Sequence, residues 1–85
     1  MDNKIIVTLF EHQNGHMTDI ELDLEITATE LFIGLNEAFG WGSNPADISD
    51  CYLAAENPIA LVKGNKKLSE FGLRNGSILH YVRHR

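Results

Sequence analysis

The segment 18-TDIELDLEITATELFIGLNEAFG-40 decides the fold. Its apolar residues first recur at every second position, as in a strand, and then at every third or fourth position, as in a helix. Over residues 18–26, apolar side chains alternate with acidic ones. This alternation is typical of a β-strand with one buried and one solvated face. The sequence therefore predicts a strand here, in a sheet that is covered on one side only. The apolar positions are Ile20, Leu22, Leu24 and Ile26, and the acidic ones are Asp19, Glu21, Asp23 and Glu25.

A helix is predicted to follow this strand directly. Thr27 and Glu30 have the spacing of a capping box, in which each side chain accepts a hydrogen bond from the backbone amide of the other residue. Gly40 can end the helix in the left-handed conformation. Residues at helical spacing predict a buried side, with the polar residues in water. The predicted buried residues are Leu31, Phe32, Leu35, Ala38 and Phe39, and the solvated ones are Glu30, Asn36 and Glu37.

The chain before this segment predicts a first strand and a hairpin. Residues 4–10, KIIVTLF, are rich in β-branched and aromatic side chains, which favour strands. The pair Asn14-Gly15 follows them and is a strong hairpin signal, because a type I′ turn needs positive φ at both of its central residues. We therefore expect a type I′ turn between the first two strands.

The chain after the helix predicts three more strands. The segment 40–50, GWGSNPADISD, has the composition of a loop. The elements after it are a strand at about Cys51–Glu56, a break at Asn57-Pro58, a strand at 59–63, a turn at Gly64-Asn65, a short helical or turn segment at 68–73, a second Asn-Gly pair at 75–76 and a strand at 77–84. A hairpin, a crossover helix and further strands predict an α+β fold of the β-grasp type, with the helix packed on a mixed sheet of four to five strands.

Length and composition indicate one small domain over residues 1–85. Cys51 is the sole cysteine, so no internal disulfide is expected. The beginning of the chain lacks the pattern of a signal peptide, and no apolar run approaches the ~20 residues of a membrane span. These features predict a cytoplasmic protein.

The net charge of -5 is unevenly distributed along the chain. Residues 1–56 hold eleven acidic residues against Lys4, whereas residues 57–85 hold Glu70 against six lysines and arginines. An acidic excess repels phosphate backbones, so no nucleic-acid partner is expected. The basic part could meet an acidic protein surface, or it could simply keep the domain soluble.

Four stretches resemble bacterial ubiquitin-like proteins in order and spacing: IIVTLF followed by NG, DIELDL, AFGW, and LSEFGLRNGSIL. Over nearly the whole chain they resemble the EsaB/YukD family, accessory proteins of the type VII (WXG/ESAT-6-like) secretion systems of Gram-positive bacteria. The resemblance implies a ubiquitin-like β-grasp and an accessory or regulatory role in the cytoplasm. It also implies a protein partner in the secretion machine, such as the cytosolic part of its membrane ATPase. Ser77 departs from the pattern, because an acidic residue is common there.

A binding surface is suggested by the resemblance to ubiquitin, whose partner patch lies on the exposed face of the sheet. His80 and Val82 match its final-strand positions, and Ala54 is the best match on the third strand. If Leu79 and Tyr81 point into the core, the period of two turns His80, Val82 and His84 outward. A merely solvated sheet face is the alternative. The predicted partner-binding residues are His80, Val82, Ala54 and Arg83.

Neither catalysis nor a cofactor is expected. The histidines, at 12, 16, 80 and 84, lack the close spacing of zinc ligands, and His12 and His16 flank the hairpin turn. No pattern places a nucleophile beside a base, so the domain is predicted to be non-enzymatic and without metal. Trp41 could cover the end of the core or be an exposed contact residue. Cys51 is expected at the edge of the core.

Two other functions remain open. The first is a ubiquitin-like adaptor of an unrelated pathway. The second is a carrier or modifier activated at its C-terminus, which needs a terminal Gly-Gly, whereas the sequence ends in Arg83-His84-Arg85. We therefore expect docking and not conjugation. The same charged ending would discourage an edge strand from pairing with a second copy, which favours a monomer.

Overall fold

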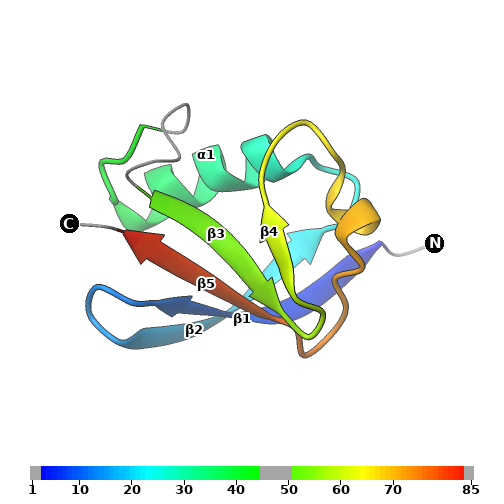
Figure 1. Cartoon of the computed structure of the whole chain (residues 1–85), viewed down its shortest axis with the longest axis horizontal. Helices are drawn as coiled ribbons and strands as arrows, with labels where there is room; N and C mark the ends of the chain where they lie inside the picture. Colours follow the sequence, from blue (N-terminus) through cyan, green and yellow to red (C-terminus); the bar gives the residue numbers. More distant parts are fainter. Residues whose placement is uncertain (1–2, 45–50, 84–85) are drawn as a thin grey trace.

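Five strands form one mixed sheet with a helix across one face, in the residues that the computed structural model describes, 3–44 and 51–83 (Figure 1). The sheet order is β2-β1-β5-β3-β4, in which β1 and β5 run parallel and the other neighbours are antiparallel. This is the predicted β-grasp arrangement. The elements are β1 (Lys4–Glu11), β2 (His16–Asp23), α1 (Ala28–Phe39), β3 (Cys51–Glu56), β4 (Ala60–Val62), the 3₁₀ helix η1 (Leu68–Phe71) and β5 (Ile78–Arg83).

The segment from β2 to α1 folds largely as its residue pattern predicts. β2 itself ends at Asp23. The amide of Leu24 still donates to Asn3 O in the register of the β1–β2 pair, and Ile26 N then donates back to Asp23 O, which turns the chain toward α1. The capping box is present, with Glu30 N donating to Thr27 Oγ1 at 3.1 Å and Thr27 N donating to Glu30 Oε1 at 2.8 Å. Gly40 ends α1 with φ of 65°. The capping and the alternation are therefore confirmed.

Two predicted positions on α1 are wrong. Ala38 was expected in the core but is exposed, and Asn36 was expected in water but is half-buried. The Asn36 side chain donates to Ser43 O at 2.8 Å and accepts from Ser43 N at 2.9 Å. Asn36 therefore holds the chain that leaves the helix.

The β1–β2 hairpin differs from the predicted type I′ turn. Glu11 pairs with His16, so four residues connect the strands. Within this loop Gly15 has a positive φ of 74°, whereas Asn14 does not. The Asn14 side chain instead accepts from His16 N at 2.9 Å, and Gly15 N donates to Glu11 O at 2.8 Å. The hairpin predicted from the Asn-Gly pair is therefore confirmed, whereas the predicted type I′ geometry is wrong.

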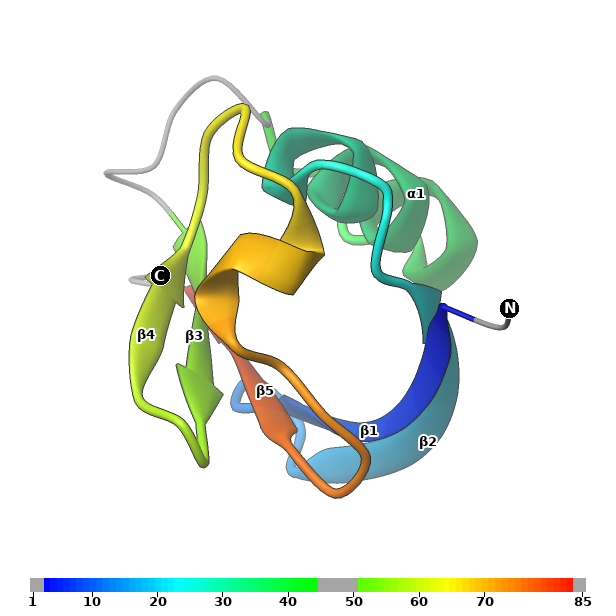
Figure 2. The same ribbon diagram turned by 90° about the vertical axis from the view of Figure 1, so that its right-hand side faces the viewer.

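The core lies between α1 and the inner face of the sheet. Its most buried strand residues are at most 1% exposed: Val7, Leu9, Cys51, Leu53, Leu79 and Tyr81. Figure 2 shows α1 above the β1 and β2 side of the sheet, with β3 and β4 on the other side and η1 between them. Within the described residues, no helix is long and apolar enough to cross a membrane.

The last strand occupies the middle of the sheet. β5 pairs with β1 on one side and with β3 on the other, so the description of Arg83 as part of a charged edge strand is wrong. The outermost strands are β2 and β4. Arg83 therefore gives no reason to expect a monomer, and His84 and Arg85 lie outside the described residues.

Trp41 closes one end of the core. It is 7% exposed, and its ring stacks on Tyr81 with 3.6 Å between ring centroids. The indole Nε1 donates to Glu11 Oε1 at 2.9 Å, which gives this buried carboxylate a donor. The prediction that Trp41 covers the end of the core is confirmed. Cys51, at 1% exposed, is also part of the core.

Candidate protein-docking surface

The outer sheet face is the side of the sheet opposite α1 (Figure 1). Because successive side chains of a strand point to opposite faces, the residues between the buried core positions share this side. The surface consists of Ile6, Thr8 and Phe10 of β1, Ile78, His80 and Val82 of β5, Tyr52, Ala54 and Glu56 of β3, and Leu61 of β4, and β2 adds Met17, Asp19 and Glu21 at its edge. Leu79 and Tyr81 are buried, as predicted.

His80 lies at the centre of the outer sheet face. In register it lies between Phe10 of β1 and Ala54 of β3. Its Nε2 is 2.8 Å from Glu56 Oε1, and its Nδ1 is 2.8 Å from His12 Nε2. The His12 ring in turn stacks on Phe10, with 4.6 Å between centroids. The imidazole of His80 is therefore fixed from two sides.

These contacts determine which ring nitrogens of His80 and His12 carry a hydrogen. An ionised carboxylate only accepts hydrogen bonds, so Nε2 of His80 donates to Glu56. In a neutral His80 ring, Nδ1 then accepts the hydrogen of His12 Nε2. Each ring nitrogen of His80 thus has a partner. The cluster presents one orientation of the imidazole to a partner.

Apolar side chains surround this polar centre. Val82 pairs with Tyr52, and Ala54 pairs with Leu61. Leu61 is 45% exposed, and Ile6 on the opposite side of the face is 48% exposed. Leu61 and Tyr52 supply the apolar area that Ala54 lacks.

Arg83 does not join the other predicted binding residues. It follows Val82 and so points to the opposite side of β5, where its Nη1 donates to Trp41 O at 2.8 Å. His80, Val82 and Ala54 are brought together on the outer sheet face. Arg83 instead holds the backbone at the Trp41 end of the core.

Tyr81, at the Trp41 end of the core, has a shifted pKa. Burial raises the pKa of the Tyr81 hydroxyl above its ordinary value of 10.0, while its hydrogen bond with Ser43 opposes that shift. The two hydroxyl oxygens are 2.6 Å apart. Tyr81 therefore stays protonated where an exposed tyrosine would ionise.

The histidines do not assemble a metal site in the described part of the chain. His12 contacts His80 and not His16, and no group of three histidine, cysteine or acidic side chains there could hold a metal ion. The absence of metal in the protein remains a prediction, which elemental analysis of the purified protein would check.

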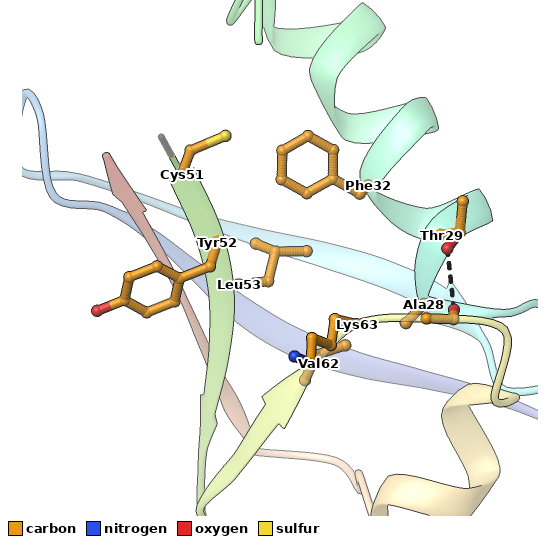
Figure 3. Close-up of a pocket in the computed structure, with 9 residues that line it drawn as sticks. Ala28, Thr29, Phe32, Cys51, Tyr52, Leu53, Val62 and Lys63 are labelled. Atoms are coloured by element: carbon orange, nitrogen blue, oxygen red, sulfur yellow. Dashed lines mark hydrogen bonds between the residues drawn. The ribbon is translucent and has the colours of Figure 1, made fainter. Parts of the chain in front are cut away.

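A small pocket lies on the other side of the sheet, between α1 and the β3–β4 pair (Figure 3). Its volume is about 40 Å³, well below the roughly 300–1,000 Å³ of ligand pockets. Cys51 and Phe32 face one another across it, and Thr29 Oγ1 donates to Gly64 O at its rim. This space fits a water molecule and not an organic substrate.

Sequence reasoning missed several members of the surface, namely Phe10, His12, Glu56 and Leu61. The alternation of β1 alone indicates that Phe10 points outward. Nothing local indicates that His12 contacts His80, which is 68 positions away. That contact depends on the parallel register of β1 and β5.

The fold is shared with several solved structures. The chain is similar to the ubiquitin-like domain of yeast Ddi1, with a TM-score of 0.76 and 19% identity over 100% of this chain and 94% of that one. It is similar to the ubiquitin-like domain of tubulin-binding cofactor B, with a TM-score of 0.77 and 15% identity over 99% and 93% of the two chains. No protein-family model and no curated protein matches the sequence.

Identities this low show a common fold and nothing about shared partners. Both alignments cover nearly the whole of each chain, including the hairpin, the crossover helix and the central final strand. The chain has the ubiquitin-like β-grasp fold.

Proposed function

We propose that this domain is a non-enzymatic docking module that binds a protein partner through its outer sheet face. The observation that supports this most directly is a ring of half-buried apolar side chains around the fixed His80, with the exposed Leu61 and Ile6 farther out on the same face. Contiguous apolar surface of this kind is characteristic of interaction sites. A partner would bury the ring and hydrogen-bond to the central polar groups.

The rigidity of the surface favours binding. The strand backbone fixes the positions of Val82, Tyr52 and Ala54, and hydrogen bonds to Glu56 and His12 fix His80. Side chains that are already ordered lose less conformational entropy when a partner binds. The outer sheet face is thus prepared for docking before the partner arrives.

The proposed biological context is a Gram-positive type VII secretion system. The resemblance of the four sequence stretches to the EsaB/YukD family supports a cytoplasmic accessory or regulatory role, with a component such as the cytosolic part of the membrane ATPase as partner. The ubiquitin-like fold is compatible with this role but does not identify a partner. On this proposal the protein acts by docking and not by conjugation.

Crosslinking in the native bacterium, followed by identification of the captured proteins, tests the context. We expect components of the secretion machine among them. Capture of proteins from other pathways alone would overturn the secretion role and favour a ubiquitin-like adaptor of another pathway. Intact-mass measurement of the protein from cells tests conjugation, because a covalent protein adduct would contradict non-covalent docking.

The surface itself is tested by the double variant His80→Ala with Val82→Ala. We expect at least about tenfold weaker capture of the partner, since central interface residues dominate binding energy. Ile33→Ala is the matched control, because Ile33 is 46% exposed on α1, on the other side of the molecule. Equal capture by both variants would move the docking site away from the outer sheet face.

A further inference from the structure

A second surface lies between β2 and α1, at the edge of the sheet farthest from β4. In Figure 2, β2 forms the right-hand edge of the sheet and α1 lies above it. The groove between them has a volume of about 440 Å³ and is mainly apolar. We call it the β2–α1 groove. Its apolar lining is Ile20, Leu22, Ile26, Leu31, Gly34, Leu35, Ala38 and Phe39, and Glu21, Asp23 and Glu30 also border it.

Gly34 leaves part of this groove without a side chain. It lies in the middle of α1, where glycine lowers helix stability relative to alanine. Its φ is not positive, and a Cβ added there would meet no heavy atom within 4 Å. Neither the backbone nor internal packing thus requires glycine. The missing side chain, with Ala38 one turn later, allows another polypeptide to approach α1 closely.

Among the residues that the structure describes, β2 has one edge that pairs with no other strand, and this edge lies beside the groove. The strand is eight residues long and outermost in the sheet, whereas the other edge strand, β4, has three residues. A strand added to β2 would turn alternate side chains toward the groove and toward the outer side of the sheet. The groove side meets Ile20 and Leu22, so it accepts apolar residues.

The outer side of the same edge is acidic. Asp19, Glu21 and Asp23 all point to this outer side. Lys4 lies opposite Asp23, so three carboxylates face one basic side chain. An added strand would therefore be favoured by basic residues at its outward positions. Two copies of β2 paired together would instead place carboxylates near carboxylates, which is unfavourable.

We propose that the β2–α1 groove binds an extended segment of a partner protein in which apolar residues alternate with lysine or arginine. The segment adds a strand to β2, packs its apolar residues against Ile20, Leu22 and Gly34, and places its basic residues beside Glu21. The groove lies on the α1 side of the sheet, whereas His80 lies on the opposite side; only the outward basic residues of the added segment would border the outer sheet face, beside Glu21 and Ile6. The groove would be present whether or not that face binds a partner.

The test uses a short labelled peptide in which valine alternates with lysine, and a matched peptide in which glutamate replaces lysine. Backbone chemical shifts of the isotope-labelled protein are followed during titration. We expect the lysine peptide to shift the amides of Ile20, Leu22 and Gly34, and the glutamate peptide to bind at least about tenfold more weakly. Shifts centred on His80 and Val82, equal binding of both peptides, or no binding at millimolar concentration would overturn the proposal.

Two variants sharpen the result. Gly34→Leu fills the groove and should weaken the binding of the lysine peptide at least about tenfold. Gly34→Ala is its control, because it should raise the melting temperature and weaken binding less. Glu21→Lys should reverse the charge preference, so that the glutamate peptide binds better to this variant than to the original protein. An unchanged preference would show that charge does not select the segment.

Discussion

The two faces of the sheet are built from the same strands and have opposite properties. On the inner face Leu79 and Tyr81 are fully buried, whereas their neighbours His80 and Val82 on the outer face are partly exposed. Adjacent residues of β5 therefore contribute to different properties, the inner ones to stability and the outer ones to binding. The inner side chains determine the free energy of unfolding, while the outer ones can change with little effect on it and are available for binding.

Leu79→Ala should produce the largest loss of stability. The leucine is completely buried, so truncation removes its contacts and leaves a cavity. We expect the free energy of unfolding to fall by about 3–4 kcal/mol. Chemical denaturation measures this change. A loss no larger than that of His80→Ala would contradict the division between the two faces.

Trp41→Phe should have the next largest effect. It removes the indole donor of Glu11 and leaves that carboxylate buried without this hydrogen bond. We expect a loss of about 2–3 kcal/mol. In the background of Glu11→Met, the same tryptophan change should cost less, because no buried carboxylate remains. Equal costs in both backgrounds would assign the effect of Trp41 to packing alone.

Ser77→Ala tests the turn before β5. Ser77 is fully buried, and its hydroxyl accepts from Arg74 N at 3.0 Å and donates to Asn57 O at 2.8 Å. Removing it should cost about 1–2 kcal/mol, since two backbone groups lose their partner. Thermal unfolding at several pH values measures the change. Ser77→Asp should also destabilise, because an ionised aspartate cannot donate to Asn57. Unchanged stability of both variants would show that the fold does not depend on the hydrogen bonds of the Ser77 hydroxyl.

Tyr81 should make stability fall in alkaline solution. Its pKa is raised in the folded protein, so above pH 10.0 the unfolded state loses this proton first and the free energy of unfolding decreases as pH rises. The contribution is complete below that pH and is lost as the pH rises through the raised pKa. Comparison of denaturation midpoints with Tyr81→Phe isolates it. A slope that persists in Tyr81→Phe would show that another group is responsible.

His80→Ala should change stability least. The histidine loses partly exposed hydrogen bonds to Glu56 and His12, and bonds of this kind contribute at most about 1 kcal/mol. Chemical denaturation should show a nearly unchanged midpoint, while the ring signals of His12 move in the NMR spectrum. A loss comparable to that of Leu79→Ala would mean that the outer sheet face is also structural.

Local patterns in the sequence determined most of the individual elements. The alternation through Ile20 and Leu22, the capping pair Thr27 and Glu30, and the helix end at Gly40 are each decided by residues a few positions apart. The bounds of β3 were predicted correctly, and those of β4 were two residues too long. The outward direction of His80 followed from the period of two.

The tertiary structure alone decided how these elements meet. It placed β5 in the centre of the sheet, brought His12 to His80, set Leu61 beside Ala54, and turned Arg83 toward Trp41. It also left open the groove beside Gly34. Such contacts depend on strand order and register between distant segments, whereas periodicity and capping report only on neighbouring residues. The sequence therefore determined which way the side chains of β2 and β5 point, because a strand alternates strictly, whereas the packing of the sheet and helix decided what they contact and which face of α1 is buried at Asn36 and Ala38.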